Sequence, residues 1–340
     1  MLRLNAYGAT SPLSVWNNIQ NPVTGYLNKF DVYQQSAGNS SSPWLVLLFP
    51  FGVLGTALVP LLVIHWRDLY GWPRVFGIAG VTLHLSFYLF IGTMKGIGDL
   101  VVMLAGAAMI AMSKMQPRRR SISPRGRALL AIAGIFAILV VFMINNHGSR
   151  AEKFGTAGIL METDPALTEA VGPFTADGLT DVISYPTHGY LGLSFNLGTP
   201  FSWSRGLGSS PAAAMFAEQN LGIKPEPTYP ERTEYRTWWP AQRYWATIYP
   251  WLASDLTFPG ALLFMGLAGW LFASSWHRSI STRRIVPILM FCQLCILILY
   301  VPANNQLGMT LESIVGMATL LIIHTARSLP GPRQSGEQVG

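Results

Sequence analysis

Long apolar blocks without any charged residue constrain the fold of this chain more than any other feature. Half of the residues are apolar and only 11% are charged, whereas soluble domains carry about 25% charged residues. A helix needs roughly 20 apolar residues to cross the hydrocarbon core. In lipid every backbone polar group must be bonded internally, so such blocks must form helices. The blocks cover 45–64, 76–93, 129–144, 256–276, 285–309 and 313–323.

The blocks predict an all-α integral membrane protein with about seven transmembrane helices and one large extracytoplasmic loop. The spans are expected at 44–65, 75–94, 98–113, 128–145, 256–276, 285–302 and 307–325. This division gives five regions along the chain. They are an extracytoplasmic tail (1–43), a four-helix membrane region (44–145), a large periplasmic loop (146–255), a three-helix membrane region (256–326) and a cytoplasmic tail (327–340).

Basic residues predict which way the helices cross the membrane, because they are retained on the cytoplasmic side. Four segments fall on one face of the seven-span arrangement: the turn with Arg67 and Arg74, the loops 114–127 and 277–284, and the tail with Arg327 and Arg333. Together they hold 13 basic and 2 acidic residues, while the other face holds 10 basic and 14 acidic residues. The net charge of +7 is therefore a sign of topology, and nucleic-acid binding is a poor interpretation of it. The loop 146–255 is expected to face outside.

The segments on the cytoplasmic side are too short for a catalytic domain, and the sequence has no P-loop and no G-x-G-x-x-G after a strand. A cytoplasmic nucleotide-sugar transferase and an ATP-driven pump are therefore unlikely classes. A channel or carrier is expected to have charges deep within its spans, but His84 is the one ionisable residue in the middle of a span. Cys292 and Cys295 share a span as packing residues, and no cluster has the spacing of metal ligands. We therefore expect the chemistry in the outside loop, without a metal or cofactor.

A candidate phosphate site lies in the loop at S-R-G-L-G-S-S-P-A-A-A, residues 204–214. Ser210 followed by Pro211 is typical of a helix start, and Gly222 of a helix stop. Arg205 and two glycines then stand just before a helix N-terminus, where free N–H groups, the helix dipole and a guanidinium favour an anion. The alternative interpretation is an ordinary turn.

Aromatic residues are frequent in the loop, and two interpretations of them remain open. They form either an interfacial belt at the membrane surface or a platform on which sugar rings stack. The residues selected as substrate-binding candidates are Tyr190, Trp203, Trp245 and Tyr249.

Several stretches resemble the Wzy-type polymerases of O-antigen and exopolysaccharide repeat units. Y-P-T-H-G-Y-L-G-L-S-F-N-L (185–197) and P-F-S-W-S-R-G-L-G-S-S (200–210) look like the central loop of that family. R-Y-W-A-T-I-Y-P-W-L-A-S-D-L-T-F-P-G (243–260) resembles the segment where its loop re-enters the membrane. G-T-M-K-G-I-G-D-L (92–100) and V-P-A-N-N-Q (301–306) resemble two of its turns. The family usually has more spans, which would lie upstream of residue 44.

The resemblance implies glycosyl transfer at the outer face of the bacterial inner membrane. The donor is a growing glycan on undecaprenyl pyrophosphate, and the acceptor is one repeat unit on the same lipid. Partner proteins implied are a flippase and a chain-length regulator, beside membrane lipid. The reaction needs cations for the departing pyrophosphate and a base for the acceptor hydroxyl. Alternatives are an O-antigen ligase, which moves a whole chain, and a transporter or flippase of the same lipid.

Site residues follow from these requirements. Arg205 and Arg243 are the predicted cations, with Arg150 and Lys95 as further candidates, because arginine suits bidentate contact with phosphate. His188 is the predicted base; the alternative is a histidine in a turn, bonded to backbone groups. Asp255 is the second candidate base, an orienting partner for an arginine, or a helix cap.

Overall fold

The computed structural model describes Leu13, Trp16, Asn17 and most of the chain from residue 52 onward. The described ranges are 52–90, 93, 95–113, 126, 133–134, 137, 140–141, 143–149, 161–241, 244–282 and 284–328. Every regular element within these ranges is helical. The elements are α5 (Gly52–Ile64), α6 (Trp72–Phe90), α7 (Lys95–Ser113), α9 (Pro165–Val171), α10 (Pro173–Leu197), α11 (Pro211–Leu221), α12 (Tyr229–Glu234), α13 (Ile248–Thr282), α14 (Ile285–Leu299), the 3-10 turn η2 (Gln306–Met309) and α15 (Leu311–Ser328).

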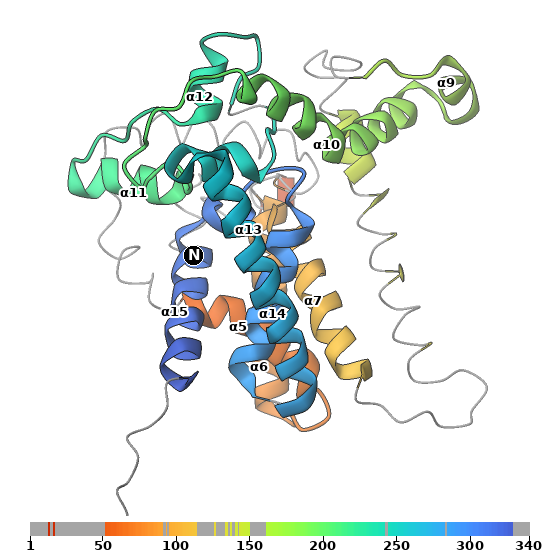
Figure 1. Cartoon of the computed structure of the whole chain (residues 1–340). Coiled ribbons are helices and arrows are strands. Elements are labelled where there is room, and N and C mark those ends of the chain that lie inside the picture. The colour runs from red at the N-terminus through yellow and green to blue at the C-terminus, as the bar shows by residue number, and fades with distance from the viewer. Residues whose placement is uncertain are drawn as a thin grey trace, which may run out of the picture.

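The helices form a bundle with a second group of helices over one end (Figure 1). In the bundle, α14 packs against α13, α7 and α15, and α5 packs against α7 and α15. We call residues 161–247, which include α9 to α12, the cap. The cap lies over the end of the bundle where α13 begins (Figure 1).

Three of the described helices, α6, α7 and α13, are long and apolar enough to cross a membrane. Shorter apolar helices cover Leu54–Ile64, Ile285–Leu299 and Leu311–Ala326. Along α13, Leu262, Leu263, Leu267 and Trp270 are exposed. A helix that turns large apolar side chains outward fits a lipid environment better than water. The described residues are therefore all-helical, as the apolar blocks predicted, and three of their helices are compatible with a membrane protein.

The helix bounds differ from the predicted spans in several places. The span predicted at 98–113 is longer, since α7 starts at Lys95. The span predicted at 128–145 and the start of that at 44–65 lie largely outside the described residues. The last predicted span is split, because η2 ends at Met309 and α15 starts at Leu311.

The largest difference is in α13, which begins at Ile248 rather than at 256. Its ladder is broken at Thr257, whose φ of 63° and ψ of 167° are not helical. The break stands two residues before Pro259, which has no N–H to donate to the preceding turn. Residues 248–256 therefore form a separate half-helix, and the predicted boundary between loop and membrane at 255/256 falls at its end.

The core of the bundle is built around α14, most of whose residues are buried. Ile288, Phe291 and Cys292 of α14 pack with Met103 and Ala107 of α7 in one apolar cluster. Buried residues of the first half of α13, among them Leu252, belong to the same cluster. The half-helix that carries Asp255 is thus anchored in the bundle core on one side while it faces the cap on the other.

Candidate functional site

Helix α10 packs against the rest of the protein through a face of small and polar residues. Thr180, Ser184, His188 and Asn196 are all buried, and their spacing of four or eight residues puts them on one side of the helix. Gly192 lies on the same side, where a Cβ would collide with the Trp245 carbonyl oxygen. The helix therefore approaches the segment before α13 closely, and the His188 side chain meets a backbone group there.

Both ring nitrogens of His188 are bonded to backbone groups, one in α10 itself and one at residue 245. Its Nδ1 lies 3.0 Å from the Ser184 carbonyl oxygen, and its Nε2 lies 3.2 Å from the Trp245 backbone nitrogen. Because a carbonyl accepts and an N–H donates, the neutral imidazole carries its proton on Nδ1. His188 is bonded to backbone groups, as the alternative interpretation expected, but it stands within a helix instead of a turn. A role as general base stays a prediction.

The pKa of His188 is lowered, chiefly because burial removes the ring from water. The hydrogen bond to Ser184 and the charge of Asp181 oppose this shift, and His147 adds to it. His147 was missed by the sequence reasoning: it is buried at the end of the helical residues 143–149, and its Nδ1 lies 3.7 Å from an Asp181 carboxylate oxygen. Asp181 of α10 therefore lies beside His147, and both residues act on the electrostatics of His188.

We expect the cap to become less stable as the pH drops below 6.5, because His188 is then protonated more easily in the unfolded chain. Since the folded-state pKa lies below the usual value of 6.5, the unfolded chain takes up this proton first as the pH falls. The contribution of neutral His188 to the free energy of unfolding is complete above pH 6.5, and it is lost as the pH drops toward the folded-state pKa. Thermal unfolding at pH 7.5 and 5.5 should show a larger loss in the wild type than in His188→Gln. Equal losses in both would assign the pH dependence to other groups.

The predicted helix start and stop in the loop are confirmed for α11. The Ser210 Oγ accepts from the Ala213 N–H at 3.1 Å, Pro211 stands in the first turn, and Gly222 ends the helix with a left-handed φ of 65°. Ser210 also donates to the Gly308 carbonyl oxygen at 2.9 Å. The start of α11 is therefore fixed to the η2 turn.

Asp255 binds the backbone N–H groups of the glycine-rich turn that were predicted to hold a phosphate. Its carboxylate accepts from Gly206 at 2.9 Å, Gly208 at 3.3 Å and Ser209 at 2.7 Å. The interpretation of Asp255 as an orienting residue gains from this geometry, although what it orients is a backbone turn and not an arginine. The N–H groups of the turn are therefore already occupied by the Asp255 carboxylate.

Arg205 pairs with a carboxylate at the surface of the cap. Its Nη2 lies 2.9 Å from a Glu226 oxygen, and the two side chains are 66% and 42% exposed. Its φ of 55° is positive, an uncommon conformation for a residue with a Cβ. Arg205 and the N–H groups that follow it therefore bind two different carboxylates.

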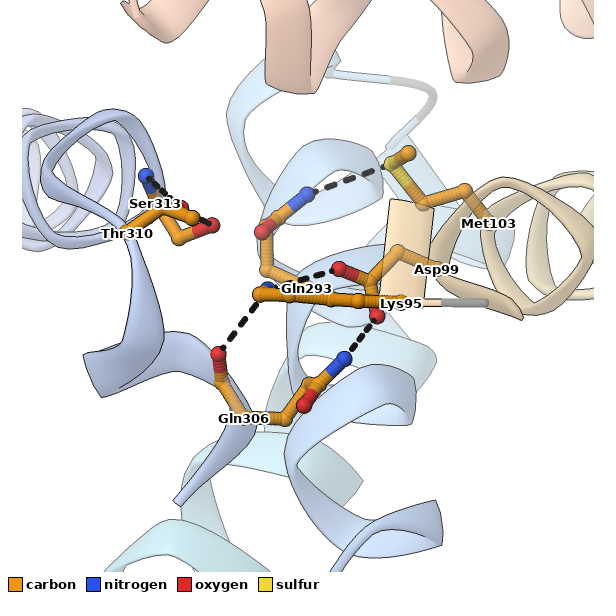
Figure 2. A network of polar contacts seen from close by, with 7 residues as sticks. All are labelled: Lys95, Asp99, Met103, Gln293, Gln306, Thr310 and Ser313. Atoms are coloured by element: carbon orange, nitrogen blue, oxygen red, sulfur yellow. Dashed lines mark hydrogen bonds and ion pairs between the residues drawn. The ribbon is translucent and has the colours of Figure 1, made fainter. Parts of the chain in front are cut away.

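A polar network ties the start of α7 to the turn before α15 (Figure 2). Lys95 Nζ donates to Asp99 at 3.0 Å and to the Gln306 carbonyl oxygen at 3.3 Å, and the Gln306 amide donates to Asp99 at 2.8 Å. The Lys95 and Asp99 side chains are only 21% and 12% exposed. Next to Gln306, Asn305 Nδ2 donates to the Ser209 carbonyl oxygen at 2.6 Å. Lys95 is thus held in an ion pair whose network reaches the glycine-rich turn.

The candidate aromatic residues separate into two groups. Tyr190 and Trp203 are more than half exposed, whereas Trp245 and Tyr249 are half-buried. Trp239, which had not been selected, is buried and donates from Nε1 to the Trp245 carbonyl oxygen at 3.0 Å. Arg150 and Arg243 lie outside the described residues. No group of three metal-ligating side chains occurs in the ranges given above.

Lys95, His188 and Asp255 thus take part in contacts where the cap meets the bundle, whereas Arg205, Tyr190 and Trp203 are exposed on the cap. Contacts there join residues from α7, α10, the 204–210 turn, the 245–255 segment and the 301–308 turn. Protein-family models, curated proteins and solved structures were compared with this chain, and none matches it. The function is therefore inferred from the residues of this junction.

Proposed function

We propose that this chain is a glycosyltransferase of about seven spans that joins lipid-linked oligosaccharide repeat units at the outer face of a bacterial inner membrane. The observation that carries the proposal is a convergence. The stretches that resemble the polymerase family stand far apart in the sequence, yet they contact one another at the junction of cap and bundle. Lys95 meets Gln306, Asn305 meets Ser209, Asp255 meets Gly206, and Trp245 meets His188. This is the pattern expected when distant segments share one site.

The proposed reaction transfers a glycan from one lipid pyrophosphate to a sugar hydroxyl on another. The bond from the donor's anomeric carbon to the pyrophosphate oxygen breaks, and a bond from that carbon to the acceptor oxygen forms. The acceptor hydroxyl loses its proton, and lipid pyrophosphate leaves with its negative charge. Cations stabilise that leaving group, and a base assists the hydroxyl. No nucleotide is consumed.

His188 and Asp255 are the proposed bases, and each has a contact that must give way first. His188 Nε2 accepts from the Trp245 N–H, so it takes a proton only after that bond opens. Asp255 has both carboxylate oxygens engaged with the turn. Contacts of this kind often differ between the free enzyme and the substrate complex. Tyr190 and Trp203, which are exposed, are the proposed surfaces for sugar rings.

The function is tested by deleting the gene and separating surface glycans by size. We expect glycan to stall at one repeat unit while lipid-linked repeat units continue to be made and to reach the outer face. Re-expression of the chain should restore long glycans. Accumulation of lipid-linked polymer instead would indicate a ligase, and retention of repeat units on the inner leaflet would indicate a flippase.

The proposed orientation is tested by labelling single cysteines with an impermeant maleimide in cells whose outer membrane has been permeabilised. Tyr235, in the cap, is 84% exposed, and Ser281, in the last turn of α13, is exposed as well. Because basic residues predict an inside location for 277–284, we expect Tyr235→Cys to react and Ser281→Cys to react only after lysis. Cys292→Ala and Cys295→Ala remove the background. The reverse pattern would contradict the orientation.

A further inference from the structure

Arg232 of α12 is held in place through one part of its guanidinium. Nη1 donates to the Ser202 carbonyl oxygen at 3.1 Å and to the Pro227 carbonyl oxygen. The guanidinium carbon lies 4.6 Å from the centre of the Tyr229 ring, in a cation–π contact. Two carbonyl groups and one aromatic face therefore orient the planar fork.

The other edge of the same guanidinium has no hydrogen-bond partner. Nε and Nη2 are buried, and neither donates to an acceptor. Buried donors without a partner are rare in proteins, because each one gives up its hydration without compensation. The Nε–Nη2 edge presents two parallel N–H groups, the geometry that matches a carboxylate or a phosphate.

Neighbouring carboxylates are committed to other groups. The Glu231 side chain accepts from the Thr228 N–H at 2.7 Å as part of the capping box of α12. Glu226 pairs with Arg205. Arg236, the next arginine in the cap, donates to the Gly198 carbonyl oxygen at 2.9 Å. Within the described ranges Arg232 thus combines a half-buried charge with an unpaired bidentate edge.

Arg232 is also linked to the glycine-rich turn through a shared hydrogen-bond acceptor. The Pro227 carbonyl oxygen that receives its Nη1 also receives the Ser204 Oγ at 3.3 Å. Ser204 N donates to the Ser254 carbonyl oxygen at 3.0 Å, and Tyr229 N donates to Ser254 Oγ at 2.8 Å. The guanidinium therefore stands beside both the turn and the half-helix that carries Asp255.

We propose that the Nε–Nη2 edge of Arg232 binds a phosphoryl oxyanion, which is the pyrophosphate of the lipid-linked donor. This rests on the proposed function, and it names a cation that the sequence reasoning did not select. An unpaired buried charge favours an anion over a neutral sugar hydroxyl, because only an anion offsets the lost hydration of the guanidinium. The edge is covered by protein atoms in this state, so the oxyanion enters when that cover moves. Low local polarity then strengthens the contact.

The experiment is isothermal titration of the purified full chain in detergent with inorganic pyrophosphate. Arg232→Gln should weaken binding about 10- to 100-fold, the range expected for losing hydrogen bonds to a charged group. Arg232→Lys should bind with intermediate affinity, because lysine supplies charge without the fork. The matched control is Arg236→Gln, on the same segment, which should bind as the wild type does. Wild-type affinity in Arg232→Gln, or no pyrophosphate binding by the wild type, would overturn the proposal.

Further measurements separate a loss of the anion site from misfolding of the variant and from binding of a lipid headgroup. Arg232→Lys keeps a positive charge next to Tyr229, so it decides the question if Arg232→Gln elutes as an aggregate. The titration is repeated in nanodiscs with and without phosphatidylglycerol. Equal pyrophosphate affinity in both supports the donor pyrophosphate as the ligand, whereas strong competition by phosphatidylglycerol overturns that assignment in favour of a lipid headgroup.

The outcome for Arg232 can be distinguished from that for the proposed function. If pyrophosphate binding depends on Arg232 but deletion of the gene leaves glycan length unchanged, the anion site is supported and the polymerase function is rejected. Glycan stalled at one repeat unit on deletion, together with pyrophosphate binding that is indifferent to Arg232, keeps the polymerase and rejects this site.

Discussion

Replacement of Asp255 with alanine is expected to disorder the 204–210 turn and to abolish long glycans. Three backbone N–H groups would lose their common acceptor. Hydrogen bonds to charged groups contribute about 1.5–3 kcal/mol each and are not additive. Loss of the carboxylate should therefore lower the free energy of unfolding by about 1.5–3 kcal/mol in total, because Asp255 is only partly buried. If the turn also positions charge-stabilising donors, chain extension should fall by about 10²–10³.

Two further variants separate the turn from the charge of Asp255. Asp255→Asn keeps one accepting oxygen but places an NH₂ group toward the N–H donors, so its effect should be smaller than that of alanine. Glu226→Gln is the matched control, because it removes only an exposed pair with Arg205, worth about 0–1 kcal/mol. The measurements are thermal unfolding in detergent and glycan length at matched protein levels. Long glycans from Asp255→Ala at wild-type stability would show that the turn does not depend on this carboxylate.

Local signals were sufficient to predict much of the helical part of the molecule. Uncharged apolar blocks predicted α6 and α14, since lipid demands internal hydrogen bonding. Ser210, Pro211 and Gly222 predicted both ends of α11, because helix caps depend on a few adjacent residues. In each case the cause of the structure lies within one short stretch of sequence.

Helix α10 could not be predicted by the same means. Its inward face carries Thr180, Ser184, His188 and Asn196, so the apolar periodicity that marks an amphipathic helix is absent. Its glycines, among them Gly189 and Gly192, lie within the helix. In the structure they permit close approach to other backbone segments, and that requirement is visible only when the partner segment is in place.

The partners of the site residues were also beyond local prediction. Asp255 contacts a turn almost fifty residues earlier in the chain, and Lys95 contacts Gln306 across more than two hundred residues. A motif such as the Arg205 turn indicates that an anion is favoured there. It does not say that Asp255 supplies one. Likewise, the unpaired edge of Arg232 is recognised only after the carboxylates near it have been assigned to other donors.

Replacement of Gly189 with alanine is expected to detach α10 from the bundle. A Cβ at this position would collide with the Pro302 carbonyl oxygen and lie 3.3 Å from the Thr247 nitrogen. Both are backbone atoms, so relief requires the helix or the 301–308 turn to shift. Forcing extra atoms into a packed site costs about 1–3 kcal/mol and occasionally more, and we expect at least the upper end here. The His188 contact with Trp245 should be lost as well.

Helix propensity gives this prediction a sharp control, because it acts in the opposite direction. Alanine favours a helix interior over glycine by about 1 kcal/mol. Gly266 lies within α13, where a Cβ would meet nothing within 4 Å, so Gly266→Ala should be neutral or stabilising. Thermal unfolding and glycan length are measured for both variants at matched membrane levels. If Gly189→Ala is as stable as Gly266→Ala, α10 does not rest on the 302 carbonyl, and the convergence of segments that supports the proposed function loses its contact between α10 and the 301–308 turn.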